Sequence, residues 1–79
     1  MARPSMYKLN RERVLEAIEE AHAGEGVPPT VRELSKKTRI SVSTLHSYIT
    51  RMHEDELVTW QPKSHRSIKV TAKGRDLIS

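Results

Sequence analysis

Hydroxyl side chains gather in the stretch SVSTLHSYITRM, residues 41–52, on what would be one side of a helix. Its apolar residues recur with a helical period and are Val42, Leu45, Ile49 and Met52. The opposite side carries Ser43, Ser47 and Thr50, with Thr44 on one flank. Serine and threonine are middling helix formers, because their hydroxyls compete for backbone hydrogen bonds. They do let a helix approach base edges closely, and they can hydrogen-bond to bases and phosphates.

Histidines and nucleophilic side chains do not form a pattern typical of catalysis or metal binding. The chain has four histidines and no cysteine, and His46 and His53 are two helical turns apart, too far to chelate one ion unaided. No segment resembles a nucleophile elbow or an oxyanion loop, and so short a chain has few residues to line a pocket. We therefore expect no metal, no cofactor and no enzymatic activity.

Length and charge limit the class of protein further. With 79 residues, 35% of them hydrophobic, the chain is long enough for one small domain. The net charge is +4 and the isoelectric point about 9.8, which favours a polyanionic partner. Acids concentrate in residues 11–25, whereas residues 30–53 and 61–75 are basic. A face shared by the two basic parts would attract a polyanion.

Targeting and membrane signals are not evident in the sequence. The N-terminal stretch MARPSMYKLN has no apolar core like that of a signal peptide, and no apolar run approaches the length of a membrane span. The lack of cysteine fits a reducing compartment. We expect a cytoplasmic protein without a membrane partner.

Capping residues and periodicity predict three helices in the first two thirds of the chain. A short basic arm, residues 1–9, precedes a helix over about 11–23, which Asn10 caps and glycines end. The stretch TVRE matches a capping box and predicts a second helix over about 31–37. Ser41 caps a third helix over 42–55.

The apolar period then changes to that of short strands. Two strands with a polar tip between them form a hairpin whose inward residues are Val58, Trp60, Ile68 and Val70. A short helix from about Ala72 to Ile78 follows. The predicted fold is therefore mainly α with a small β-hairpin, a single winged helix-turn-helix domain over residues 10–79.

Three segments resemble winged helix-turn-helix regulators. GVPPTVREL, residues 26–34, resembles the segment that opens the second helix in the DNA-binding domain of LexA repressors. SVSTLHSYITRMHEDELV, residues 41–58, resembles the recognition helix and following strand of LexA and MarR-family repressors. VTAKGRDLI, residues 70–78, is similar to the TxKGxxL ending found after the wing in MarR-like regulators. The resemblance extends from about residue 8 to residue 78.

The resemblance implies a transcription regulator, which we expect to be a repressor of bacterial or phage origin. Its third helix, 42–55, would lie in the major groove of double-stranded DNA, and its wing, 61–67, on the backbone or in the minor groove. The base contacts that it implies are Ser43, Thr44, Ser47, Arg51, His46 and Tyr48. For the backbone we expect Thr30, Lys36, Lys37, Arg39, Ser41, Thr50, Lys63, Arg66 and Lys69.

Two departures limit what the resemblance implies. Full LexA repressors add a self-cleaving domain that dimerises them, and MarR-type proteins add dimerisation helices, and these 79 residues contain neither pattern. We therefore expect no small-molecule effector, and we carry over no cleavage switch. A single module should bind modestly, so a homodimer or paired sites are expected. The alternatives are a protein-interaction module that offers acidic residues to a basic partner, and a non-specific nucleic-acid binder.

Overall fold

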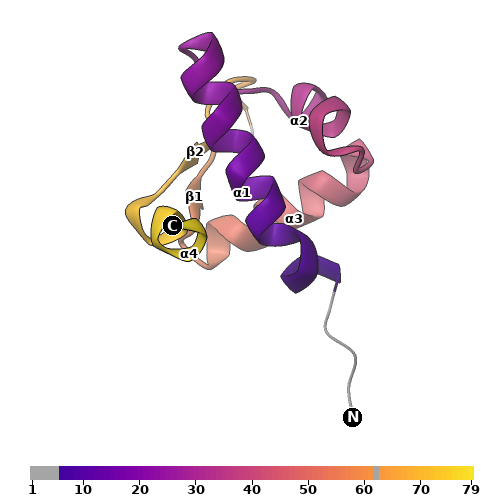
Figure 1. Cartoon of the computed structure of the whole chain (residues 1–79). Helices are drawn as coiled ribbons and strands as arrows, with labels where there is room; N and C mark the ends of the chain where they lie inside the picture. The colour runs from indigo at the N-terminus through magenta and orange to yellow at the C-terminus, as the bar shows by residue number, and fades with distance from the viewer. Residues whose placement is uncertain (1–5, 62) are drawn as a thin grey trace.

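The computed structural model describes residues 6–61 and 63–79. They form four helices and one two-stranded sheet (Figure 1). In chain order the elements are α1 (Met6–Glu25), α2 (Val31–Thr38), α3 (Val42–Glu54), β1 (Val58–Thr59), β2 (Lys69–Val70) and α4 (Ala72–Ile78). The predicted fold, mainly helical with a small hairpin in the order of a winged helix-turn-helix, is confirmed.

The first helix begins earlier than the sequence predicted. It starts at Met6, so Asn10 lies inside the helix and does not cap it. Residues 6–9, predicted to belong to an arm, are helical, and residues 1–5 lie outside the described residues.

A tertiary contact accounts for this longer helix. The Tyr7 side chain is only 4% exposed, and its hydroxyl donates to Asp55 Oδ2 at 2.9 Å, across the molecule. Packing of this kind stabilises a turn that local propensity alone does not indicate. Because Asp55 lies 48 residues further along the chain, no local pattern around residues 6–9 could report the contact.

Capping side chains fix where the shorter helices begin. Thr30 Oγ1 accepts from the Glu33 amide at 3.1 Å, and Glu33 Oε1 accepts from the Thr30 amide at 2.9 Å. This is the predicted capping box at the start of α2. The Ser41 side chain caps α3, as predicted, by accepting from the Thr44 amide, and Thr71 caps α4 in the same way.

The buried apolar core is formed by α1, α2, α3, both strands, and Leu57 and Ile68 beside them, and Leu77 and Ile78 of α4 pack against it while partly buried. Its buried members are Tyr7, Val14, Leu15, Ala17, Ile18, Leu34, Leu45, Ile49, Met52, Leu57, Val58, Ile68 and Val70. The prediction that Val42 belongs to this core is wrong, since its side chain is 45% exposed. Val42 is the first residue of α3, one turn before Leu45, where that helix enters the core. Trp60, also predicted inward, is half-buried at the core edge.

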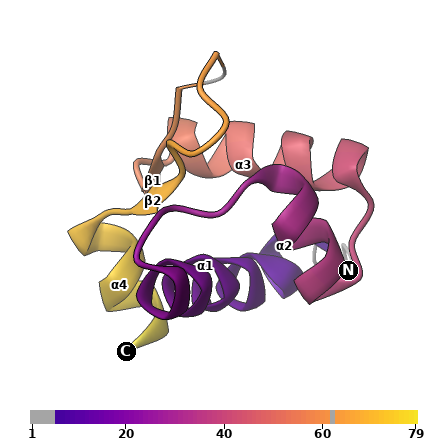
Figure 2. The same ribbon diagram turned by 90° about the horizontal axis from the view of Figure 1, so that it is seen from above.

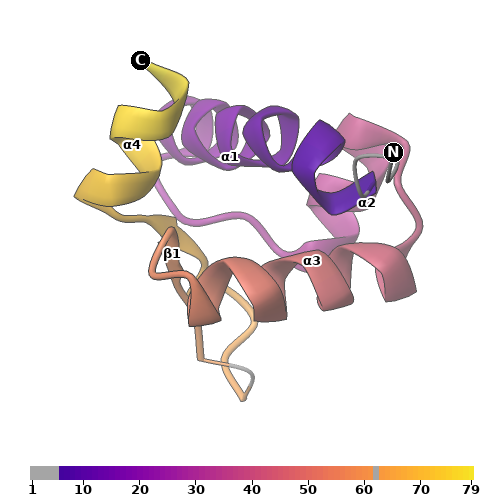
Figure 3. The same ribbon diagram turned by 90° about the horizontal axis from the view of Figure 1, so that it is seen from below.

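The hairpin pairs in the predicted orientation and carries a wing. β1 and β2 are antiparallel, with Val58 opposite Val70, and both of these side chains are buried. We call the described residues of the connection, 60–61 and 63–68, the wing. It projects beyond α3 on the side away from α1 (Figures 2 and 3). Helix α3 and the wing therefore share one side of the molecule, and α1 and α4 lie on the other.

Helix α4 packs closely on the start of the hairpin. It has the predicted bounds, and a Cβ atom built on Gly74 would lie 2.3 Å from the Leu57 carbonyl oxygen and 2.8 Å from Val70 Cγ1. No side chain fits there without displacing the backbone. This gives the TxKGxxL ending a physical meaning: Thr71 caps the helix, and the glycine allows the close approach.

Candidate nucleic-acid interface

Helix α3 and the wing lie on the same side of the molecule (Figures 2 and 3), and both, with the adjoining start of β2, carry exposed polar side chains. We call this set the α3–wing face. Its exposed members are Ser43, Thr44, His46, Ser47, Thr50, Lys63, His65 and Lys69. The face thus brings together most of the predicted base contacts and two of the predicted wing cations.

Three hydroxyls, those of Ser47, Thr50 and the cap residue Ser41, donate within α3 or its cap. Thr50 Oγ1 donates to the His46 carbonyl at 2.8 Å, and Ser47 Oγ to the Ser43 carbonyl at 3.4 Å. The Ser41 hydroxyl donates to Thr44 Oγ1 at 2.9 Å while it accepts from the Thr44 amide. A hydroxyl has one donor and two acceptor lone pairs, so these groups still offer acceptors to a ligand. Bonds from serine and threonine to the carbonyl four residues earlier also compensate partly for their weak helix propensity.

Basic residues divide into two groups by their partners. Three are ion-paired within the protein: Lys37 with Glu20 at 3.2 Å, Arg66 with Glu33 at 3.0 Å and Arg75 with Glu19 at 3.1 Å. The predicted backbone contacts that have no side-chain partner among the described residues are Lys36, Arg39, Lys63 and Lys69. These four are all exposed, so their charge is available to a polyanion.

Arg66 links the wing to the start of α2. Its guanidinium donates to both carboxylate oxygens of Glu33, at 3.0 and 3.2 Å, and to the Pro28 carbonyl at 3.2 Å. Glu33 also accepts from the Thr30 amide, so one carboxylate joins the capping box to the wing. The Thr30 backbone bond, and then the Arg66 side-chain bond, hold the pKa of Glu33 below its ordinary value of 4.5. Contact between Arg66 and DNA stays a prediction, and this pair would compete with it.

The C-terminal end of α3 is attached to α1. The guanidinium carbon of Arg51 lies 4.4 Å from the centroid of the Tyr7 ring, and the Tyr48 ring packs on the same tyrosine at 5.9 Å between centroids. Burial, followed by the hydrogen bond to Asp55, raises the pKa of Tyr7 to about 12. Arg51 and Tyr48 are thus engaged with α1, apart from the Ser43–Ser47 end of the helix.

An open hollow of about 420 Å³ lies between the wing and the N-terminal ends of α2 and α3. Its lining residues are Thr30, Val31, Arg32, Val42, His46, Trp60, Ser64 and His65. Two predicted contacts, Thr30 and His46, meet here, and the His46 and Trp60 rings touch edge to face at 4.9 Å between centroids. Arg32 was not singled out from the sequence, although a cation at the second position of a capped helix is a usable signal. Nothing in the sequence indicated that Val42 belongs among the contact residues, because its helical spacing predicted that it is buried in the core.

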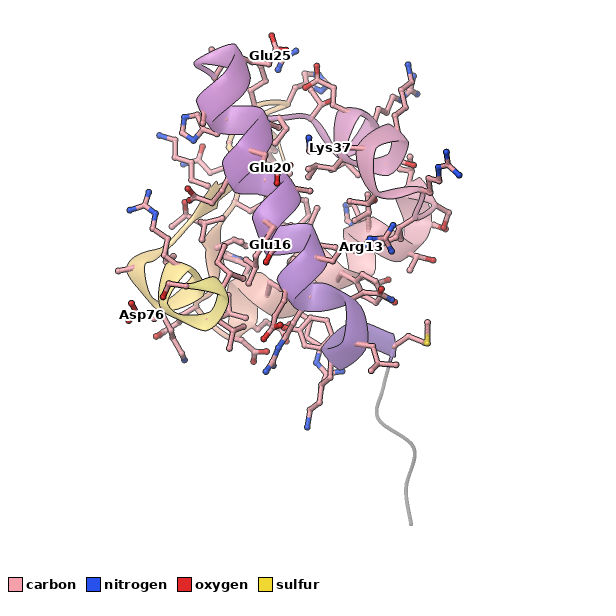
Figure 4. The ribbon with its side chains drawn as sticks, in the orientation of Figure 1. Arg13, Glu16, Glu20, Glu25, Lys37 and Asp76 are labelled. Carbon is pink, nitrogen blue, oxygen red and sulfur yellow. The ribbon has the colours of Figure 1, made fainter. Side chains whose placement is uncertain are left out.

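The labelled acidic side chains of α1 lie away from this face. Figure 4 shows Glu16 and Glu20 on the side of α1 turned toward the viewer, with Glu25 at the C-terminal end of the helix. In the same orientation α3 passes behind α1 (Figure 1). A polyanion would therefore meet the α3–wing face in preference to the exposed side of α1.

The described part of the chain holds neither a cluster of metal-ligating side chains nor a helix able to span a membrane. Across residues 6–61 and 63–79, no three histidine, cysteine or acidic side chains gather as a metal site requires. No helix there is both long and apolar enough to cross a membrane. Hydrogen bonding and positive charge are what the α3–wing face offers a ligand.

Known proteins match the same elements. Residues 28–59, from the segment before α2 through β1, match the family of winged helix-turn-helix DNA-binding domains. The LexA repressor of Lacticaseibacillus casei is 35% identical over 68 residues, 85% of this chain and 33% of the repressor. The LexA repressor of Limosilactobacillus reuteri is 35% identical over 77 residues, 92% of this chain and 37% of the repressor.

A third relative agrees with these two. The LexA repressor of Oenococcus oeni is 37% identical over 70 residues, 87% of this chain and 33% of the repressor. The chain thus spans about a third of the length of the curated relatives it matches. The chain therefore has a winged helix-turn-helix fold, matches a winged helix-turn-helix DNA-binding family over residues 28–59, and is similar to part of the LexA repressors.

Proposed function

We propose that this protein is a sequence-specific regulator of transcription, a repressor, that binds double-stranded DNA through the α3–wing face. The observation that carries the proposal is the separation of charge: unpaired cations and hydroxyls share one side of the molecule, and the exposed acids of α1 lie on the other. Such a distribution directs one face toward a polyanion.

Each part of the face has its own role in the proposal. Helix α3 enters the major groove with its N-terminal end, where Ser43, Thr44 and Ser47 contact base edges. Lys63 of the wing and Lys69 at the start of β2 bind phosphates, and the capped start of α2 at Thr30 faces another phosphate. Arg66 acts indirectly, since its bonds to Glu33 fix the wing beside α2.

A salt titration tests whether DNA is the partner. Fluorescence anisotropy on a labelled duplex should give an affinity that falls linearly with salt on a double-logarithmic plot, because binding releases counterions from the duplex. A flat response to salt would contradict the proposal. Selection of duplexes from a random pool should then yield a consensus, and pools without one would point to a non-specific binder.

Lysine variants test the role of the wing. Lys63→Ala should weaken binding to all duplexes similarly and reduce the salt slope by about one. Arg75→Ala is the matched control, because it also removes one positive charge but from a residue that binds Glu19 on the α1 and α4 side. Equal effects of the two variants on affinity would show that only the net charge of the protein matters, and that the position of the charge on the wing does not.

Binding as a homodimer is part of the proposal. A single module is expected to bind modestly, and two copies on one duplex would select half-sites at a fixed spacing of about one helical turn or a multiple of it. Repeated half-sites in the selected duplexes would support a dimer. Isolated single sites would contradict it.

A second candidate function is a protein-interaction module. It is favoured by the exposed acids of α1, which could meet a basic partner (Figure 4). This alternative predicts a stable protein complex in a pull-down that Glu16→Lys abolishes, together with no measurable binding to DNA.

A further inference from the structure

Large apolar side chains are exposed at four places among the described residues: Met6, Leu9, Val27 and Val42. Met6 and Leu9 lie in the first turns of α1, and Val27 in the connection between α1 and α2. Val42 alone of these four belongs to α3, where its neighbours are the hydroxyl-bearing residues of the α3–wing face. A single exposed apolar side chain is ordinary on a protein surface, so the 45% exposure of the Val42 side chain is informative only through what surrounds it.

The surroundings of Val42 are those of a contact point. It lines the hollow between α2, α3 and the wing, together with the apolar groups of Val31 and Trp60. Arg32, His46 and His65 supply polar groups to the same hollow. Val42 thus offers one apolar contact among hydrogen-bonding and cationic groups at the start of α3. Such surroundings suit a ligand that is polar except for one apolar group.

Rigidity adds to the suitability of this side chain. Valine is branched at Cβ and in a helix has one strongly preferred χ1 rotamer. It therefore loses little conformational freedom when a ligand covers it. The first turn of a recognition helix is also the part that approaches base edges most closely.

We infer that Val42 contacts the 5-methyl group of a thymine and so selects thymine at one position of the bound duplex. The methyl group of thymine is the apolar group that the four base pairs display on the major-groove edge, so an apolar side chain there distinguishes thymine from the other bases. The inference rests on the proposed function, because it requires α3 to lie in the major groove. It adds a specificity-determining residue that neither the periodicity nor the resemblance indicated.

Replacing thymine by deoxyuridine removes this methyl group and leaves base pairing unchanged. On the duplex obtained by selection, each thymine in turn is replaced, and the affinity of the protein is measured by anisotropy. Deoxyuridine at one position should lower the affinity of the protein for the duplex roughly threefold to tenfold, the effect expected from about one buried methyl or methylene group. The Val42→Ala variant should bind the unmodified duplex more weakly by a similar factor and should lose its sensitivity to deoxyuridine at that one position.

Val27→Ala is the matched control, since Val27 is 43% exposed, nearly as much as Val42, but lies outside α3. It should keep the full sensitivity to deoxyuridine. Val42→Thr, which keeps one methyl group, should retain part of it, and it guards against an effect of Val42→Ala on folding.

The possible outcomes separate the two proposals. Selective, salt-dependent binding with the same deoxyuridine profile for Val42→Ala and the unaltered protein would overturn the inference and leave the proposed function standing. A profile without any sensitive thymine would do the same. Absence of any selected duplex would overturn the proposed function, and the role of Val42 with it.

Discussion

The two ends of α3 do different work, and the contrast between them explains why the helix is built as it is. In the N-terminal half, Leu45 is buried, and the hydroxyls of Ser47 and Thr44 bond only within the helix or its cap. In the C-terminal half, the Tyr48 ring and the Arg51 guanidinium pack on Tyr7 of α1. Both ends are therefore packed on the core, but only the polar side chains of the C-terminal half are engaged with α1, and those of the N-terminal half stay exposed.

The contrast refines how the helix should be divided. Periodicity divides α3 around its circumference, into an apolar side and a hydroxyl side. The structure adds a division along its length, because Tyr7 of α1 contacts Tyr48 and Arg51 in the C-terminal half of the helix. Arg51, predicted to contact a base, belongs by its contacts to the anchored end, whereas Val42, predicted to be buried, belongs to the exposed end. Substitutions at the anchored end should change stability, and those at the exposed end should change DNA selectivity.

The largest effect should come from filling the space at Gly74, beside the point where the chain leaves α3. A Cβ atom there would lie 2.3 Å from the Leu57 carbonyl oxygen, so Gly74→Ala must move backbone. We expect a loss of about 1–3 kcal/mol in the free energy of unfolding, or roughly 4–8 °C in Tm for each kcal/mol. Thermal unfolding followed by circular dichroism measures this.

Gly24 provides the control for this substitution. It lies within α1, and a Cβ atom there has no neighbour within 4 Å, so Gly24→Ala should stabilise the protein by about 0.5–1 kcal/mol. If both variants shifted Tm in the same direction, the close packing at Gly74 would not be what anchors this region.

Tyr7→Phe should weaken the anchor itself. It removes the hydrogen bond to Asp55 but keeps the ring under Arg51, so a loss of about 0.5–1.5 kcal/mol in the free energy of unfolding is expected. The affinity for DNA of the folded protein should not change. A large loss of affinity at a temperature where the variant is fully folded would break the proposed division.

The raised pKa of Tyr7 adds a pH signature to the same variant. The folded pKa of about 12 exceeds the ordinary value of 10.0, so the neutral hydroxyl is favoured in the folded state. This contribution to stability is fully present below pH 10 and is lost as the pH rises through about 12. Denaturant titrations across this range should show an alkaline loss in the unaltered protein that is smaller in Tyr7→Phe.

Ser47→Ala should separate stability from selectivity at the exposed end. Alanine is the better helix former, so the free energy of unfolding should rise by a few tenths of a kcal/mol, about 0.5 at most. The preference among duplexes should nevertheless become weaker, because the proposed contact between this hydroxyl and a base would be lost. A stability gain with an unchanged selected consensus would remove Ser47 from the proposed base contacts.

The smallest effect on global stability should follow from Glu33→Gln. The ion pair with Arg66 is exposed, and such pairs contribute little to stability. The amide shifts of the wing should move, because its attachment to α2 is weakened. Glu19→Gln, which loses an ion pair with Arg75 outside the wing, should leave those shifts in place.

Acid should have the same effect on the wing as Glu33→Gln. The pKa of Glu33 is lowered in the folded state, so its contribution is present above the ordinary value of 4.5 and is lost as the pH falls through the lowered value. Wing shifts in the unaltered protein should therefore approach those of Glu33→Gln at acid pH. A wing that stayed unchanged in both experiments would show that Arg66 does not hold it.

Local signals predicted the parts of this fold that depend on local interactions. The capping box at Thr30, the Ser41 cap and the bounds of α4 follow from side chains that bond a few residues away. The early start of α1 and the positions of Arg51 and Arg66 depend on partners 33 to 48 residues distant, or on another helix, and no local pattern reports them. The predicted burial of Val42 was wrong for a related reason. A helical period indicates which side of a helix faces the core, but it does not indicate where along the helix the core ends.

The shared carboxylate of Glu33 has a consequence for the speed of binding. Because it accepts from both the Thr30 amide and the Arg66 guanidinium, the wing is already placed beside α2 before any DNA arrives. A loop that must order itself after the first encounter slows association and loses entropy in the complex, whereas a preorganised one does neither. We therefore expect cutting this link to lower the rate of association more than it raises the rate of dissociation.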